Sequence, residues 1–244
     1  METIQNDVQI IETIKNYLEK SSSESLQSND FMHITSNETI EGIQIRNFNQ
    51  INEDLIIDSS SDIGSYNFDW KNVAYLYAGA QKNLGIPGVS ISIIRDDFIE
   101  ENQNPTYLNL KKLIDKDSLL NTPPTFSIYV LKLVTDWMLQ MGGIEYFENQ
   151  SIENSNAVYS LLSKFNEYVQ IPVDEYSRSR MNIVFNFKNL NHEELFLKKS
   201  LENNIIGIKG HRSIGGIRIS LYNSIDKPSV QYLLDFMNSF FKGL

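Results

Sequence analysis

Lys82 and Asp58 are the residues whose types and positions could do chemistry together. Lys82 stands in the segment YAGAQKN, just past an apolar run, with Gly79 and Ala80 before it and Gly85 after it. A lysine amine acts as a nucleophile only when it is unprotonated, which requires desolvation or a neighbouring cation. Asp58 ends the apolar run LIID, and α/β folds place their sites at the carboxyl ends of buried strands.

Each of these two residues also has an ordinary structural explanation. A lysine at a strand end can extend its amine to water while its methylenes cover apolar surface, and an aspartate after a strand can cap the next helix. At the ends of neighbouring strands, however, Lys82 and Asp58 form the pair that pyridoxal phosphate needs. The lysine bonds the cofactor covalently, and the acid keeps the pyridine nitrogen protonated so that the ring accepts electrons.

The glycine-rich segment KGHRSIGGIR carries a second group of polar side chains, His211, Arg212 and Arg218. Arginine forks suit carboxylates and phosphates, so this segment predicts an anionic ligand. Pairing of the arginines with surface acids is the alternative. A metal site is not predicted, because His33, His192 and His211 show no ligand spacing.

The segment NTPPT, residues 121–125, combines a side-chain amide, a hydroxyl and an expected helix N-terminus. Such a place binds phosphate well. The alternative is ordinary capping ahead of a first turn that contains proline.

Four apolar runs, FMHIT, LIID, VAYLYAGA and VSISIIR, have the length and residue types of strands. We expect them to form a largely buried sheet whose strand ends hold Asp58 and Lys82. Before them, a helix is predicted over residues 8–20, followed by the polar loop SSSESLQSND. After them, NTPPTFSIYVLKLVTDWMLQMGG predicts a Pro-initiated helix that is apolar on most sides and should therefore be buried.

The pattern changes after QMGG. Beyond it we expect a helix over residues 156–169, a strand over residues 180–187 and a further helix with Asn191 as its N-cap. IIGIKGHRSIGGIRISLYN predicts two strands joined by a glycine-rich turn. The last helix should carry one apolar face, formed by Val230, Leu233, Met237, Phe240 and Phe241.

The predicted fold is α/β, in two domains. Residues 1–141 are expected to form a large domain with a mostly parallel sheet and helices. Residues 142–244 are expected to form a small α+β domain, so that the boundary falls near residue 141.

Composition limits the kinds of partner that the chain can have. The 244 residues are 41% hydrophobic, with a formal net charge of -10 and no cysteine. The negative charge disfavours nucleic acid and anionic membranes, and the lack of cysteine disfavours disulfides and thiolate zinc sites. No signal peptide or apolar run of membrane-spanning length is visible, so a cytoplasmic protein is expected.

Five segments in a fixed order carry a resemblance to a known family: HITSNETIEG, YAGAQKNLG, NTPPTF, RSRMN and KGHRSIGGIRISLYN. They resemble motifs of the phosphoserine aminotransferases, which are class-V members of the fold-type-I pyridoxal-phosphate enzymes. The resemblance runs from about His33 to the C-terminus. Several multi-residue motifs in order are far more specific than a lone glycine-rich loop.

The resemblance implies an activity. The family moves an amino group from L-glutamate to 3-phosphohydroxypyruvate, which gives O-phospho-L-serine and 2-oxoglutarate in serine biosynthesis. In bacteria it also serves pyridoxine biosynthesis. A homodimer is implied, because each subunit of the family completes the site of the other.

The resemblance also implies a role for individual cofactor-binding residues. Lys82 would be the Schiff-base lysine and the catalytic residue, and Asp58 would pair with the pyridine nitrogen. Thr39 would bond the ring-hydroxyl side of the cofactor. Gln81 would lie beside its phosphate.

Four further residues would bind phosphate groups, two of them on the cofactor of the other subunit and two on the substrate. Asn121 and Thr122 would reach the cofactor phosphate of the other subunit. His211 and Arg212 would help to bind the substrate phosphate across the dimer, while Arg218 would hold the substrate α-carboxylate.

The chain is shorter than members of the family, which begin well before the segment that matches Met1. We therefore expect an N-terminally truncated chain with an incomplete large domain and weak or absent transaminase activity on its own. A catalytically impaired remnant, or a non-catalytic partner of a complete aminotransferase subunit, is the alternative. A cysteine desulfurase is disfavoured because the persulfide-forming cysteine is absent, and the ordered motifs disfavour a generic α/β binding protein.

Overall fold

The computed structural model describes residues 31–48, 51–99 and 109–244. The helix predicted over residues 8–20 and the loop predicted over residues 21–30 lie outside the described residues.

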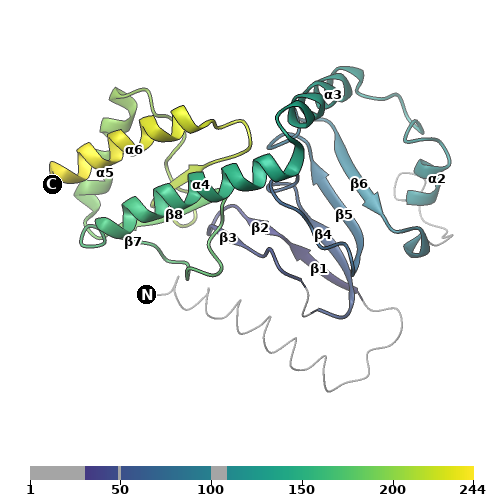
Figure 1. Cartoon of the computed structure of the whole chain (residues 1–244), viewed down its shortest axis with the longest axis horizontal. Coiled ribbons are helices and arrows are strands. Elements are labelled where there is room, and N and C mark those ends of the chain that lie inside the picture. Colours follow the sequence, from purple (N-terminus) through teal and green to yellow (C-terminus); the bar gives the residue numbers. More distant parts are fainter. Residues whose placement is uncertain (1–30, 49–50, 100–108) are drawn as a thin grey trace.

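A four-stranded sheet dominates the first half of the described chain, and all four predicted strands are present (Figure 1). The strands are β1 (Phe31–Thr35), β4 (Asp54–Asp58), β5 (Val73–Gly79) and β6 (Ser90–Ile94). Their order is β1-β4-β5-β6, with β1, β4 and β5 parallel and β6 antiparallel to β5. The prediction of a mostly parallel sheet is therefore confirmed.

Only one face of this sheet is deeply buried, which corrects the expectation of a largely buried sheet. Leu55 and Ile57 in β4 and Leu76 in β5 are fully buried, because alternate side chains of a strand point to the same face. Their neighbours Ile56 and Tyr75 are half-buried. No described helix buries that second face as deeply, so its side chains keep contact with solvent.

Short elements flank the sheet. β2 (Asn37–Glu38) and β3 (Ile43–Gln44) form an antiparallel pair directly after β1. The 3-10 helix η1 (Asp96–Phe98) follows β6, and α2 (Leu110–Ile114) precedes the first long helix.

That helix, α3 (Thr125–Gln140), begins after NTPP as predicted, but the prediction that it is buried is wrong. Met138 is its one buried residue among those described, and Leu131 and Val134 also pack on the core of the sheet. The helix touches the sheet along this single stripe, so the rest of its apolar surface has no described neighbour that would bury it. The exposed apolar side chains of α3 are Phe126, Ile128, Tyr129, Leu133, Trp137 and Leu139.

The next helix, α4 (Gly143–Lys164), begins earlier than the predicted residue 156 and runs from the sheet to the second half of the molecule (Figure 1). Gly142 and Gly143 separate it from α3 with φ angles of 117° and 70°, which side chains other than glycine rarely adopt. Phe147 packs in the core of the sheet, whereas Val158 and Leu162 pack in a second core. α4 thus belongs to both cores, and the domain boundary near residue 141 stays a prediction.

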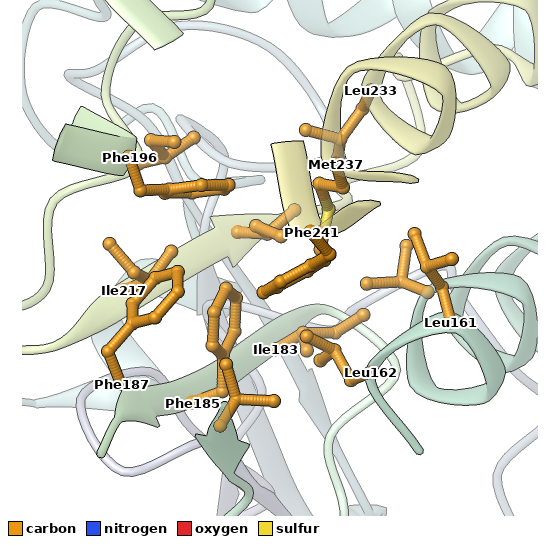
Figure 2. Packing of buried hydrophobic residues seen from close by; sticks show 14 of the residues in the cluster. Leu161, Leu162, Ile183, Phe185, Phe187, Phe196, Ile217, Leu233, Met237 and Phe241 are labelled. Atoms are coloured by element: carbon orange, nitrogen blue, oxygen red, sulfur yellow. The ribbon is translucent and has the colours of Figure 1, made fainter. Parts of the chain in front are cut away.

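The second core is built from three antiparallel strands and the helices around them. β7 (Val169–Gln170), β8 (Asn182–Phe187) and β9 (Ile217–Ser220) form a sheet in that order, and α5 (Leu190–Glu202) and α6 (Lys227–Lys242) pack with it. Figure 2 shows the side chains of Phe185, Phe187, Phe196 and Phe241 converging at its centre.

Two local predictions in this region are wrong. The N-cap of α5 is Asn189 rather than Asn191, because the Asn189 side chain accepts a hydrogen bond from the backbone N–H of Asn191 at 3.0 Å. The segment before the glycine-rich turn makes a single bridge, from Lys209 to Ile217, instead of a full strand. Gly207, with a φ of 76°, interrupts the extended backbone there.

The predicted apolar face of α6 is confirmed, with Val230, Leu233, Met237 and Phe241 buried and Phe240 packed at the edge. Within the described residues, no helix has both the length and the apolar character needed to cross a membrane.

Candidate functional site

The carboxyl ends of the parallel strands bring the first candidate residues to one edge of the sheet. Thr35 of β1 lies opposite Asp58 of β4, which lies opposite Tyr77 of β5. Because these three strands are parallel, the loops that follow them leave the sheet at the same edge. Lys82 is in the turn immediately after β5, where the N–H of Leu84 donates to the carbonyl of Ala80.

Four charged residues act on the pKa of Lys82. Burial lowers the pKa of Lys82 below its usual value, and the positive charge of Arg218 acts in the same direction. The negative charges of Asp58, Glu38 and Asp62 oppose this shift. The amine is therefore easier to deprotonate than a surface lysine, which is what a nucleophilic lysine requires.

Asp58 is held at the sheet edge by its own loop. Its Oδ1 accepts a hydrogen bond from the backbone N–H of Ser60 at 2.9 Å, and the side chain is half-buried. Burial first, and then the negative charge of Asp58, raise the pKa of Tyr77, whose hydroxyl lies 2.9 Å from Nε2 of His33. The Asp58 side chain therefore stands at this strand end with part of its surface exposed.

Arg218 reaches this edge from the three-stranded sheet β7-β8-β9, which we call the second sheet. It lies in β9 opposite Val184, and its guanidinium donates to the carbonyl of Thr39 at 3.2 Å. Its Nε is buried and has no hydrogen-bond partner among the described residues. A buried, unpaired guanidinium nitrogen is costly unless an anion satisfies it.

Gln81 lies over the end of β5. A Cβ atom at Gly79 would stand 2.4 Å from Oε1 of Gln81, so the close approach of this side chain requires glycine there. The N–H of Gly79 donates to the hydroxyl of Ser60 at 3.1 Å. These contacts bring Gln81 and the loop after Asp58 together beside Lys82.

The remaining candidate residues are not joined to this group within the described part of the chain. Asn121 and Thr122 are exposed in the segment between α2 and α3. Arg212 is exposed in the turn before β9, and the Nδ1 of His211 contacts the hydroxyl of Ser213 at 2.6 Å. One chain therefore unites Lys82, Asp58, Thr39, Gln81 and Arg218, whereas no described contact joins the other four to them.

Two buried residues near Lys82 were missed in the sequence. Asp62 is fully buried and accepts hydrogen bonds from Ser36 and Ser59. Asn83, directly after Lys82, donates to the carbonyl of Ile63 at 3.1 Å and accepts from the N–H of Asn223 at 3.0 Å. The only signal for Asp62 was its place in the polar run SSSD after a strand, and Asn83 gave none beyond its adjacency to Lys82.

A third missed residue, Asn37, links the loop after β4 to the second sheet. Its side-chain amide donates to Ser61 at 2.8 Å and to Asn182 of β8 at 2.9 Å, and its carbonyl oxygen accepts from Ser179. All of these atoms are buried. The relative position of Lys82 and Arg218 is therefore fixed by a polar network between the sheets.

The site thus combines an amine with a lowered pKa, a carboxylate at a strand end and a guanidinium with an unpaired nitrogen. The amine can attack a carbonyl carbon, the carboxylate can hold a cationic ring nitrogen, and the guanidinium can hold a carboxylate.

Comparison with known proteins gives a consistent result. The family model described as aminotransferase class-V matches residues 6–233. The phosphoserine aminotransferase of Campylobacter jejuni is 40% identical over 215 residues, which cover 86% of this chain and 60% of that protein.

Solved structures agree. The phosphoserine aminotransferase from Bacillus circulans subsp. alkalophilus superimposes with a TM-score of 0.85 at 39% identity, covering 90% of this chain and 62% of that one. A phosphoserine aminotransferase solved in work on radiation damage of its Schiff base has a TM-score of 0.86 at 41% identity, covering 92% and 63%. The chain spans about 60% of the length of the curated relatives that it matches.

Proposed function

The chain belongs to the class-V aminotransferase family, and from this premise we propose that it acts as a pyridoxal-phosphate-dependent phosphoserine aminotransferase. The proposed reaction moves the amino group of L-glutamate to 3-phosphohydroxypyruvate, which yields O-phospho-L-serine and 2-oxoglutarate. The observation that carries the proposal is the meeting of Lys82, Asp58 and Arg218 at one sheet edge. Arg218 comes there from the second sheet and bonds Thr39, 179 residues earlier.

The residues fit pyridoxal phosphate on two observations. The Lys82 amine is half-buried with a lowered pKa, and a carboxylate stands at the neighbouring strand end. When bound, the cofactor supplies an electron sink and carries the amino group between the two substrates. Lys82, Asp58, Thr39 and Gln81 are the residues of this chain that would hold it.

Lys82 has two proposed tasks. Its Nζ would hold the cofactor, and its free amine would serve as the base that takes a proton from the substrate α-carbon and returns one. A lowered pKa serves both tasks, because a protonated amine can neither attack nor accept a proton. Asp58 keeps the ring nitrogen protonated by accepting its hydrogen bond.

Arg218 is the proposed partner of the substrate α-carboxylate. Its buried Nε lacks a partner among the described residues, so a carboxylate would satisfy an atom that otherwise costs stability. His211 and Arg212 are proposed to contact the substrate phosphate. Their exposed turn suits a site that is completed by a second subunit.

We expect a homodimer, because Asn121, Thr122 and Arg212 are exposed on this chain and so are open to a second subunit. In the proposed dimer, Asn121 and Thr122 reach the cofactor phosphate of the other subunit. Sedimentation equilibrium should give twice the 28.1 kDa chain mass, and Asn121→Ala should weaken cofactor binding without changing that mass. A monomer at micromolar concentration that still binds cofactor would contradict this arrangement.

The activity is tested by assaying the purified chain with pyridoxal phosphate, glutamate and 3-phosphohydroxypyruvate. We expect phosphoserine to form at a low rate, in line with the weak activity predicted for the chain on its own. We expect Arg218→Gln to lower kcat/KM by a further factor of about 10 to 100, since a hydrogen bond to a charged group contributes about 1.5–3 kcal/mol. Arg95→Gln is the matched control, because Arg95 pairs with Asp54 at the opposite end of β4. No phosphoserine from the unaltered chain would refute the activity, and an unchanged kcat/KM in Arg218→Gln would refute the role of Arg218.

A further inference from the structure

Asp62 is a buried carboxylate at the centre of the loops that leave the sheet edge. Its side chain is fully buried, in the turn after β4. Oδ1 accepts hydrogen bonds from the hydroxyl of Ser36 at 2.6 Å and from the hydroxyl of Ser59 at 2.7 Å. Oδ2 accepts from Nε2 of Gln44 at 3.1 Å. One carboxylate therefore gathers the loop after β1, the loop after β4 and strand β3.

Each of the three donors is also linked either to Asp58 or to the segment that leads into β8. The N–H of Ser36 donates to the carbonyl of Asp58 at 3.0 Å, and the Ser36 hydroxyl oxygen, whose proton goes to Asp62, lies 3.1 Å from the same carbonyl. Ser59 follows Asp58 directly in the chain. Oε1 of Gln44 accepts from the backbone N–H of Arg180, at 3.0 Å, just before β8. Asp62 therefore holds the backbone of Asp58 on one side and the second sheet on the other.

Stability alone does not account for a carboxylate at this position. All three donors are neutral, and transferring a charge out of water is costly when no counter-charge is paired with it. The pKa of Asp62 is raised to about 6, mainly by burial and to a smaller degree by the negative charge of Asp58, against the lowering effect of the Ser36, Ser59 and Gln44 hydrogen bonds. The other charged or titratable groups that act with Asp62 are Arg46, Tyr66 and Lys82.

We propose that Asp62 is a positioning residue for the cofactor site, whose carboxylate fixes the Asp58 loop against Lys82 and against the second sheet. That a cofactor binds here rests on the proposed function, whereas the hydrogen bonds of Asp62 do not depend on it. Asp62 touches neither substrate nor cofactor. It acts through Ser36 and Ser59, which determine where the Asp58 backbone stands.

Titration of Asp62 gives the proposal a pH signature. The folded-state pKa lies above the ordinary value of 3.8, so the protonated form stabilises the fold below pH 3.8, and this contribution is lost as the pH rises through about 6. Protonation also turns one carboxylate oxygen into a donor, so the side chain can no longer accept all three hydrogen bonds. Cofactor affinity should therefore fall more steeply below pH 6 in the unaltered chain than in a chain without this carboxylate.

The test compares Asp62→Asn with Asp235→Asn. Asparagine keeps the shape and an acceptor for the two hydroxyls but loses the charge, and Asp235 is an exposed control that accepts a side-chain bond from Gln231. Two readouts are taken: hydrogen exchange of residues 55–63 in the cofactor-free chain, and the dissociation constant of pyridoxal phosphate from pH 5 to pH 8. The exchange readout follows the N–H groups of Asp62 and Ile63, which donate to the carbonyl of Ser59.

In Asp62→Asn we expect hydrogen exchange over residues 55–63 to be about tenfold faster than in the unaltered chain at the same pH. Cofactor binding at pH 7.5 should be about tenfold weaker. The change in the cofactor dissociation constant between pH 5 and pH 7 should be smaller than in the unaltered chain. Asp235→Asn should match the unaltered chain in all three. Unchanged exchange, or faster exchange with unchanged cofactor affinity, would overturn the positioning role.

The test remains decisive if the chain binds no cofactor or if Asp62→Asn does not fold. If the unaltered chain binds no pyridoxal phosphate, the proposed function is refuted, and the exchange readout alone still decides whether Asp62 holds the loop. If Asp62→Asn does not fold, Ser59→Ala removes one donor at the same oxygen, and the same exchange and affinity changes, in smaller measure, are expected. A folded Ser59→Ala chain with unaltered exchange would then overturn the proposal.

Discussion

Replacing Lys82 by alanine is expected to abolish covalent capture of pyridoxal phosphate by this chain. The Lys82 amine is half-buried with a lowered pKa and has Asp58 nearby, whereas an exposed lysine is protonated at neutral pH and reacts slowly. The measurement is the visible absorbance that remains with the protein after gel filtration. The protein is also reduced with borohydride and its mass is measured. Digestion of the reduced protein then locates the modified lysine.

The control for this prediction is Lys71→Ala, which removes an exposed lysine from the turn that leads into β5. It should retain the absorbance and the label at residue 82. The prediction also has a pH component, because a lowered lysine pKa means capture at a lower pH than for free lysine. Equal absorbance in Lys82→Ala and the unaltered chain would show that another amine binds the cofactor.

Replacing Phe196 by alanine should destabilise the second core by about 3–5 kcal/mol, the usual cost of removing a buried aromatic ring. Phe196 is fully buried, and its ring centroid lies 5.3 Å from that of Phe187 and 5.0 Å from that of Phe240. The surrounding rings come from β8 and α6, so no single neighbour can move to fill the space (Figure 2). Urea unfolding followed by far-UV circular dichroism measures the change.

Leu201→Ala in the same helix is the matched control, because Leu201 is 63% exposed and its loss should change the free energy of unfolding by less than about 0.5 kcal/mol. Tryptophan fluorescence separates the two cores. Both tryptophans, Trp70 and Trp137, pack with tilted rings of the first core, Phe68 and Phe147. Equal urea midpoints for Phe196→Ala and Leu201→Ala would contradict the packing of the second core.

The strands and the apolar face of α6 could be predicted because each rests on local residue types and spacing. The burial of α3 could not. Its apolar residues surround the helix, and this composition is shared by a helix inside a core and by a helix whose apolar surface is left outside. The N-cap of α5 was misplaced by two residues because both Asn189 and Asn191 are good capping residues.

The candidate site was predictable to the extent that strand ends fix it. Asp58 and Lys82 follow neighbouring parallel strands, so their proximity follows from the sheet. The contact between Arg218 and Thr39 joins two separate sheets, and no spacing in the sequence encodes it. Asp62 was missed because its importance lies in three long-range donors rather than in its own neighbours in the chain.

Asn83 has a consequence for the order in which the protein loses function on heating. It follows Lys82 in the chain and accepts a hydrogen bond from Asn223, whose side chain in turn donates to the carbonyl of Gly64 at 2.9 Å. The turn that carries Lys82 is therefore clamped by the segment between β9 and α6. When the second core melts, that clamp opens even while the parallel sheet stands, so thermal inactivation should precede the melting of the sheet.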